Sequence, residues 1–279
     1  MKIGVSALAW TTRLNSSHLD LFPALREHGI EALEIPLFDP AELNVAALCR
    51  AFHASGLTPT VCAILPNAIN PISPDAAERS KARAYLAQCI ETAAEMGACL
   101  IGGPVFAPNG YFPGHRRNQD EWTWAVEIFQ SLRELLDTYQ ITLSIEPVNR
   151  SESFFLNTGA EAKVFCEAID HPRVGVTIDT FHANIEEKNI AQTVLSLGAG
   201  LKHLHASEND RGLLGSGHVD FPAIVAALRQ IDYDGLLMIE GFGYSASEPE
   251  SLGALWGDLL ISPEDIAYRG AEYLRGLLI

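Results

Sequence analysis

Short runs of Val, Ile and Leu alternate with longer amphipathic stretches from one end of the chain to the other. Eight of these short runs have the length and composition of strands that are buried on both faces. They are Lys2–Ala7, Glu31–Pro36, Thr58–Ile64, Ala98–Gly103, Ile141–Glu146, Val174–Asp179, Leu201–His205 and Gly235–Glu240. Successive runs begin about 33 residues apart on average, which is the length of a strand–helix–strand unit.

Apolar residues at three- and four-residue spacing predict helices between these runs. The clearest are Leu19–Glu27, Val45–Ala54, Ala76–Met96, Trp122–Tyr139, Ala160–Ile169 and Pro222–Gln230. Gly29, Gly56 and Gly97 stand where a helix-terminating glycine is expected. Parallel strands need such crossovers, and eight strand–helix units are the number that closes a barrel. The pattern therefore predicts an α/β fold, a (β/α)8 TIM barrel.

An open, doubly wound sheet is the competing architecture. The first strand is not followed by the G-x-G-x-x-G turn typical of that fold. The chain also has no linker, charge block or low-complexity tract that would mark a second domain. We therefore expect one barrel domain over residues 1–279.

The composition of the chain disfavours several classes of binding partner and of structural site. The chain has 19 Lys and Arg against 35 Asp and Glu, a net charge of −16, which disfavours nucleic acid and anionic membranes. The cysteines are odd in number and form no C-x-x-C pair, so neither a disulfide framework nor a structural zinc site is expected. The N-terminal MKIGVSALAW does not read as a leader, and no apolar run is long enough to span a bilayer. These features predict a cytoplasmic protein with reduced thiols.

Four consecutive predicted strands end on residues that can bind a metal. Glu146 ends the fifth, Asp179 the sixth, His205 the seventh and Glu240 the eighth. In a barrel the carboxyl ends of the strands converge, so these side chains are expected to meet. Three carboxylates in a partly dry site need a countercharge, and one imidazole with three oxygen ligands suits Mn²⁺, Mg²⁺ or Co²⁺.

Each of these residues also has a simpler explanation. Asp179 precedes Thr180 and is well placed to cap the next helix. His205 is compatible with a core histidine, and Glu146 precedes Pro147, which is compatible with a solvated loop. The occurrence of all four at successive strand ends is what favours a divalent cation site.

Further polar residues follow these strand ends. Glu152, His182 and Arg211 lie on the predicted loops above the barrel, where they are expected to contact the hydroxyl groups of a sugar-like ligand. Cys62, near the end of the third strand, is a weaker candidate for substrate contact. His203 is expected to point outward toward the helices and to have a structural role.

The segments IEPVNRSE, IDTFHANIEE, HLHASENDRG and IEGF, in this order, resemble the ketose 3-epimerase family, which includes D-tagatose and D-psicose 3-epimerases in the xylose-isomerase-like barrel superfamily. The resemblance implies that Glu146, Asp179, His205 and Glu240 bind one divalent ion, usually Mn²⁺ or Co²⁺. It also implies that Glu146 and Glu240 form the acid/base pair. Substrate contacts are implied for Glu152, His182 and Arg211. The chain departs from the family at Pro147 and in the loop Ala107–His115.

Epimerisation beside a ketone explains why two glutamates are needed. One carboxylate removes the carbon-bound proton, a cation stabilises the resulting cis-enediolate, and an acid on the opposite face returns a proton. Glu146 and Glu240 end strands that are separated by two others, which is room for a small ligand. The prediction is metal-dependent epimerisation at C3 of an unphosphorylated ketohexose or ketopentose.

Three other functions stay open at this point. An aldose–ketose or hydroxypyruvate-type isomerase would use the same scaffold with one base. Metal-assisted phosphodiester hydrolysis is disfavoured by the net charge, and a catalytically silent sugar-binding protein would bind a cation without moving a proton. A phosphorylated sugar is disfavoured because Arg211 is the one basic residue of the loop RGLLGSGH, and the loop GFGYSASEPE has none.

Two long loops, Pro104–Gln119 and Gly241–Leu260, are expected to act as binding loops or lids. Gly102, Gly103 and Pro104 are expected to allow the backbone to approach a ligand closely. Aromatic residues on the rim loops are candidates for excluding water or for forming the interface of a homodimer or homotetramer. They are Trp10, Phe106, Tyr111, Phe112, Phe242 and Tyr244.

Overall fold

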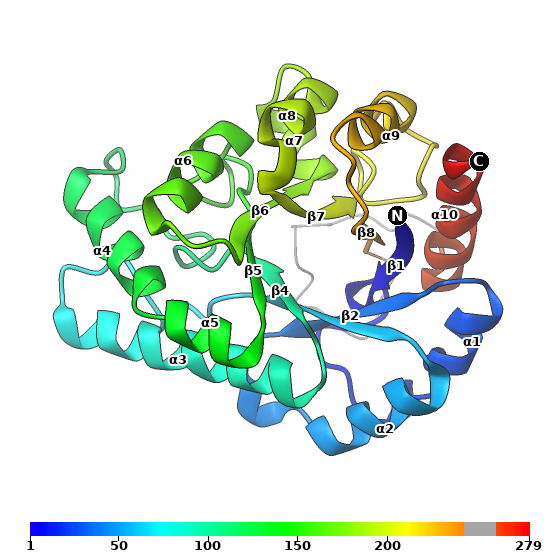
Figure 1. Cartoon of the computed structure of the whole chain (residues 1–279), viewed down its shortest axis with the longest axis horizontal. Helices are drawn as coiled ribbons and strands as arrows, with labels where there is room; N and C mark the ends of the chain where they lie inside the picture. Colours follow the sequence, from blue (N-terminus) through cyan, green and yellow to red (C-terminus); the bar gives the residue numbers. More distant parts are fainter. Residues whose placement is uncertain (243–260) are drawn as a thin grey trace.

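The structure is a computed structural model that describes residues 1–242 and 261–279. Eight parallel strands close into a barrel in sequence order, and β1 pairs with both β2 and β8 (Figure 1). The strands are β1 (Lys2–Ser6), β2 (Ala32–Leu37), β3 (Thr58–Ala63), β4 (Leu100–Gly103), β5 (Thr142–Ile145), β6 (Val174–Asp179), β7 (Leu201–Ala206) and β8 (Leu236–Ile239). The predicted (β/α)8 TIM barrel is confirmed, with each strand within two residues of its predicted bounds.

Helices surround the barrel (Figure 1). They are α1 (Leu21–Glu27), α2 (Val45–Ser55), α3 (Ala76–Glu95), α4 (Gln119–Gln130), α5 (Arg133–Tyr139), α6 (Gly159–Ile169), α7 (Thr180–Glu186), α8 (Ile190–Leu197), α9 (Phe221–Gln230) and α10 (Pro263–Leu278). Four short 3₁₀ turns lie in the connections of the described residues: η1 (Ala7–Ala9), η2 (Ser16–His18), η3 (Pro40–Glu42) and η4 (Gly198–Gly200). The last helix, α10, packs against β1 and β8. In the described part of the chain, no helix has the length and apolar character needed to cross a bilayer.

The predicted helix Trp122–Tyr139 is two helices, α4 and α5. Ser131 interrupts it, because its hydroxyl donates to the carbonyl oxygen of Ile128 at 2.6 Å and competes with the regular helical hydrogen bonds. The helix-terminating glycines behave as predicted. Gly56, for example, ends α2 in the left-handed conformation with φ of 68°.

Gly103 is required at the end of β4 by its backbone conformation and by its contact with β3. Its φ is +118°, and a Cβ atom there would lie 2.2 Å from the carbonyl oxygen of Ala63. The close approach is therefore to the neighbouring strand β3. The carbonyl oxygen of Gly103 in turn accepts a hydrogen bond from the backbone N–H of Glu146 at 3.2 Å.

The prediction that His203 points toward the helices is wrong. His203 and His205 are two residues apart on β7, so both side chains face the inside of the barrel. Both are fully buried, and their rings meet edge to face with centroids 4.9 Å apart. The centre of the barrel therefore holds a polar group that includes Glu34 of β2, which bonds to His203 at 3.0 Å.

Candidate active site

The four predicted ligands meet at the carboxyl ends of β5 to β8. Glu146 follows β5, Asp179 ends β6, His205 lies in β7 and Glu240 follows β8. One ligand atom from each lies within 4.8 Å of the others, and all four side chains are buried. Residues up to 94 positions apart in the chain thus form one compact cluster, because parallel strands end at the same edge of the barrel.

Local backbone geometry positions the two glutamates. The N–H of Glu146 donates to Gly103, and the N–H of Glu240 donates to the carbonyl oxygen of Ala206 at 2.9 Å. Each glutamate therefore continues the hydrogen-bond ladder one step beyond its strand. Glu146 is 3 % exposed, so Pro147 does not move it onto a solvated loop.

Asp179 has two roles at once. Its Oδ1 accepts the N–H of Phe181 at 2.8 Å and caps α7, as the simpler explanation of this residue predicted. Its Oδ2 faces the cluster, 2.6 Å from Nη1 of Arg211. The cap fixes the carboxylate, so that the second oxygen is held toward Glu240 and His205.

The surroundings of the His205 ring show that these residues fit a cation. Its Nδ1 lies 3.5 Å from Oε1 of Glu146 and 3.3 Å from Oε2 of Glu240. This nitrogen is buried and has no hydrogen-bond partner among the described residues. A buried ring nitrogen that faces two carboxylate oxygens without a hydrogen bond is well suited to bind a divalent ion together with them.

Arg211 supplies positive charge beside the cluster. Its Nη1 donates to Oδ2 of Asp179 and, at 2.8 Å, to Oε2 of Glu240. The guanidinium group lies 4.1 Å from the ring centroid of Phe181 and 4.9 Å from that of Phe242. Arg211 is 4 % exposed, so the predicted loop residue is in fact a buried component of the site.

His182 and Glu152 lie beside the cluster and are joined by Asn149. Nδ1 of His182 accepts the backbone N–H of Asn149 at 3.2 Å, and Oε1 of Glu152 accepts the Asn149 side-chain amide at 2.8 Å. Nε2 of His182 lies 3.7 Å from Oδ2 of Asp179. The structure therefore brings these two predicted substrate residues next to the predicted ligands.

The carboxylates of the cluster have unequal proton affinities. Burial raises the pKa of Glu146, His205 opposes this shift and the charges of Glu240 and Asp179 add to it, with a net pKa of about 7. The pKa of Asp179 is also raised, mainly by burial. Burial acts in the same direction on Glu240, but the charges of Arg211 and His205 outweigh it, so its pKa lies below the usual range. The two proposed acid/base residues thus differ in how readily they hold a proton.

Two other groups are neutral in this setting. Burial lowers the pKa of His182 to about 3, which makes its imidazole a neutral hydrogen-bonding group. Burial and the charge of Glu34 raise the pKa of the Cys62 thiol well above its usual value. Cys62 is 2 % exposed, and the charges of Glu146 and His205 act on its thiol, so it is a buried neighbour of the cluster.

Three residues in and around the site were missed at the sequence level. Glu34 contacts the ring of His205, Asn149 joins His182 to Glu152, and Glu208 organises the loop that carries Arg211. Glu34 could have been identified from the sequence, because it is the one acidic residue inside the otherwise apolar run ALEIPL. A fully buried strand has no solvated position for a carboxylate, so such a residue needs a partner.

The rim aromatics are found in different environments. Phe106 is fully buried and stacks on Phe155 at 5.7 Å, and Trp10 donates to Glu264 at 2.8 Å. Tyr111 and Phe112 are 36 % and 49 % exposed on the loop after β4. Tyr244 and most of the predicted loop Gly241–Leu260 lie outside the described residues.

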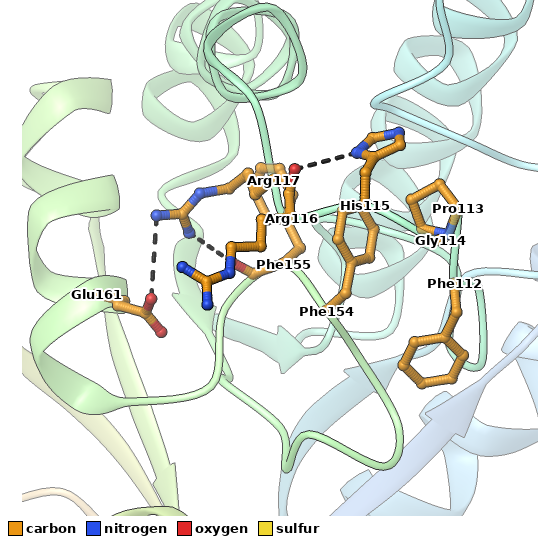
Figure 2. A pocket seen from close by; sticks show the side chains of 9 residues that line it. All are labelled: Phe112, Pro113, Gly114, His115, Arg116, Arg117, Phe154, Phe155 and Glu161. Carbon is orange, nitrogen blue, oxygen red and sulfur yellow. Dashed lines mark hydrogen bonds and ion pairs between the residues drawn. The ribbon is translucent and has the colours of Figure 1, made fainter.

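The loop after β4 forms a surface cavity away from the cluster. Figure 2 shows Phe112, His115, Arg116 and Arg117 of this loop together with Phe154, around a cavity of 570 Å³. The charge of Arg117 is directed toward Glu161, 3.9 Å away. The loop thus presents aromatic and basic side chains on an otherwise acidic protein.

Comparison with known proteins places this geometry in a family. The profile of the xylose isomerase-like TIM barrel family matches residues 22–277. This chain belongs to that family. Its relatives include an L-ribulose 3-epimerase of Methylomonas sp., 30% identical over 88% of this chain and 87% of the relative. A ketose 3-epimerase of Arthrobacter globiformis is 29% identical over 100% of this chain and 97% of the relative.

Solved structures agree with the sequence relatives. A D-allulose 3-epimerase from Methylomonas sp., crystallised with D-allulose, superposes with a TM-score of 0.93 at 28% identity and covers 99% of this chain and 96% of its own. The predicted resemblance to ketose 3-epimerases is confirmed, and the protein is an enzyme of the isomerase class. The relatives support a sugar 3-epimerase activity.

Proposed function

We propose that this enzyme epimerises C3 of an unphosphorylated ketohexose or ketopentose in a reaction that depends on a divalent cation. The observation that supports this most strongly is the buried cluster of Glu146, Asp179, His205 and Glu240, with ligand atoms within 4.8 Å of one another. The relatives named L-ribulose 3-epimerase and ketose 3-epimerase match 88% and 100% of the chain. One catalytic domain over residues 1–279 is part of the same proposal.

The cation would be held by these four residues, and when bound it supplies positive charge for the oxygens of a cis-enediolate. Mn²⁺ is the proposed ion, with Co²⁺ and Mg²⁺ as alternatives, because three carboxylates and one imidazole suit these hard or borderline ions.

Glu146 and Glu240 are the proposed acid/base pair. One carboxylate takes the proton from C3, and the other returns a proton to the opposite face of the planar intermediate. The surroundings raise the pKa of Glu146 and lower that of Glu240, so the two carboxylates are chemically distinct. Glu152, His182 and Arg211 are proposed to bind and orient the sugar hydroxyls, with Cys62 below the reacting carbons.

The loop after β7 supports a sugar without phosphate. Barrels often bind phosphate through free backbone N–H groups at this position. Here the carboxylate of Glu208 already accepts the N–H groups of Asn209, Gly215 and Val219, at 3.1, 3.0 and 3.0 Å. An internal anion therefore occupies the donors that a phosphate group would need.

The deciding experiment is an incubation of Mn²⁺-loaded enzyme with a panel of free ketoses in D₂O, followed by NMR. We expect deuterium at C3 and the appearance of the C3 epimer. Exchange at C1 would instead select the aldose–ketose or hydroxypyruvate-type isomerase. Cation binding without exchange at any carbon would contradict an epimerase and leave a sugar-binding role. The same ketoses as phosphate esters should react more slowly.

The cellular setting and assembly are further parts of the proposal. We propose a cytoplasmic enzyme, because the composition and the free cysteines suit a reducing compartment. We also propose a homodimer or homotetramer, which the exposed aromatic side chains of Tyr111 and Phe112 support. Neither nucleic acid nor a membrane is among its proposed partners.

A further inference from the structure

Beneath the proposed cation site lies a further acidic residue with no assigned role. Glu34 of β2 is fully buried in the centre of the barrel. Its Oε1 lies 3.1 Å from Nε2 of His205, and its Oε2 accepts a hydrogen bond from Nε2 of His203 at 3.0 Å. The hydroxyl of Thr60 adds a weaker contact to Oε2 at 3.4 Å. One carboxylate thus spans two imidazole rings.

The two edges of the His205 ring face different partners. Nδ1 faces Glu146 and Glu240 of the ligand cluster, whereas Nε2 faces Glu34. A neutral imidazole carries one proton, and a carboxylate beside Nε2 favours the proton on that nitrogen. Nδ1 then presents its lone pair to the cluster.

We propose that Glu34 is a positioning residue that fixes the tautomer and orientation of His205 for cation binding. The inference rests on the proposed function, because it requires a cation at the cluster. A carboxylate behind a metal-bound histidine orients the ring and strengthens it as a ligand, and its loss lowers metal affinity about 10- to 100-fold. Glu34 does not touch the substrate site in this role.

A different interpretation treats Glu34, His203 and His205 as ligands of their own cation, because their ligand atoms also lie within 4.8 Å of one another. Against this, the oxygen of Glu34 nearest His203 is already hydrogen-bonded to it, and the group is closed on all sides within the barrel. The two interpretations predict different stoichiometries. The positioning role predicts one cation per chain, and the second site predicts two.

The test compares Glu34→Gln with wild type by titration of the metal-free enzyme with Co²⁺, recorded in the visible spectrum. We expect wild type to bind one Co²⁺ per chain and the variant to bind about 10- to 100-fold more weakly, with a changed spectrum. Equal affinity and an unchanged spectrum in Glu34→Gln would overturn the inference, as would two Co²⁺ per chain in wild type. Wild type that binds no Co²⁺ would instead overturn the proposed function.

A matched control separates positioning from general damage to the interior. Ser144→Ala also removes a buried polar group of the barrel, one that accepts from Thr177 at 2.6 Å and does not touch Glu34. This variant should keep the wild-type Co²⁺ affinity and spectrum. A loss equal to that of Glu34→Gln would show that any interior polar change weakens the site.

A second measurement does not depend on a folded Glu34 variant. Wild-type protein labelled with ¹⁵N-histidine and loaded with ¹¹³Cd²⁺ should show cadmium coupling to Nδ1 of His205 and a proton on Nε2. The resonances are assigned by their loss in His205→Gln. Cadmium coupling to Nε2, or an Nε2 without a proton, would contradict the role of Glu34.

Discussion

At the residue scale, the site combines groups whose charges would repel each other without a countercharge. Glu146, Asp179 and Glu240 are buried together, and Arg211 and His205 are the positive or proton-bearing groups against them. Burying a carboxylate without a countercharge lowers the stability of a folded protein by roughly several kcal/mol. The cluster is therefore held for its chemistry rather than for stability.

Glu146→Gln and Glu240→Gln should each abolish turnover. The amide keeps the size of the side chain and one oxygen ligand but does not exchange a proton, and losing an acid/base group lowers kcat about 10²- to 10⁴-fold. The measurement is the rate of C3 epimerisation with saturating Mn²⁺. Glu127→Gln, an exposed change on α4, is the control and should retain full activity. Near-normal turnover in either site variant would remove that glutamate from the mechanism.

Asp179→Asn should separate the two roles of Asp179. Asparagine caps helices about as well as aspartate, so α7 stays capped, while the cation loses a charged ligand. We expect slow exchange of the Phe181 amide and at least about tenfold weaker Mn²⁺ binding, a loss of the size seen when metal-site partners are removed. Asp179→Ala should lose both properties. Retained Mn²⁺ affinity in Asp179→Asn would contradict its assignment as a ligand.

At the element scale, the ends of neighbouring strands position one another. The carbonyl oxygen of Gly103 at the end of β4 accepts the N–H of Glu146 after β5, and Gly103 passes close to Ala63 at the end of β3. Three strand ends are therefore connected at the rim. A change in one of these strand ends is therefore expected to move Glu146.

Gly103→Ala should be strongly destabilising. Its φ of +118° disfavours alanine, and the added Cβ would lie 2.2 Å from a backbone oxygen, so we expect a loss of about 3–5 kcal/mol. Gly97→Ala is the matched control. Its φ is +84° with nothing within 4 Å of the added Cβ, so its cost should be about 1–2 kcal/mol. Urea unfolding measures both, and equal losses would show that the contact with Ala63 is relieved elsewhere.

At the scale of the whole molecule, the net charge of −16 suits an uncharged substrate. An anionic sugar phosphate would be repelled on approach, whereas a free sugar is not affected by this field. The acidic site at the mouth of the barrel and the acidic surface together favour cations. The molecule is thus electrostatically suited to the proposed metal and to a neutral ketose.

Removal of the cation should lower both activity and thermal stability. A ligand that binds the folded state at 100 times its Kd stabilises it by about 2.7 kcal/mol, which corresponds to roughly 5–10 °C for a chain of this size. We expect EDTA to abolish turnover and lower the unfolding temperature, and Mn²⁺ or Co²⁺ to restore both. In Asp179→Ala the same additions should leave the unfolding temperature nearly unchanged. Full activity after complete chelation would contradict metal dependence.

The assembly proposal has its own test. Phe112, 49 % exposed beside the cavity in Figure 2, is a candidate interface residue. We expect sedimentation to show a dimer or tetramer and Phe112→Asp to shift it toward the monomer. Val164→Asp, at an exposed apolar position on α6, is the control and should leave the mass unchanged. A wild-type monomer at micromolar concentration would contradict the proposal.

The periodicity of apolar residues determined the barrel, and the residues at the ends of its last four strands determined the cluster. Both could be predicted because they depend on local order: a strand ends where its apolar run ends, and parallel strands end together. The break between α4 and α5 at Ser131 was not predicted. The apolar pattern continues through this position, and the break comes with the hydrogen bond of a single hydroxyl.

Only the tertiary structure decided which side chains contact one another across the barrel. Glu34 and His203 are 169 residues apart in the chain, and Arg211, on the loop after β7 as predicted, is buried against Asp179 and Glu240. Such pairings depend on the curvature and closure of the sheet, which brings distant strands face to face at its centre. The residues at the strand ends therefore predicted the cluster, while barrel closure placed Glu34 against one of its members.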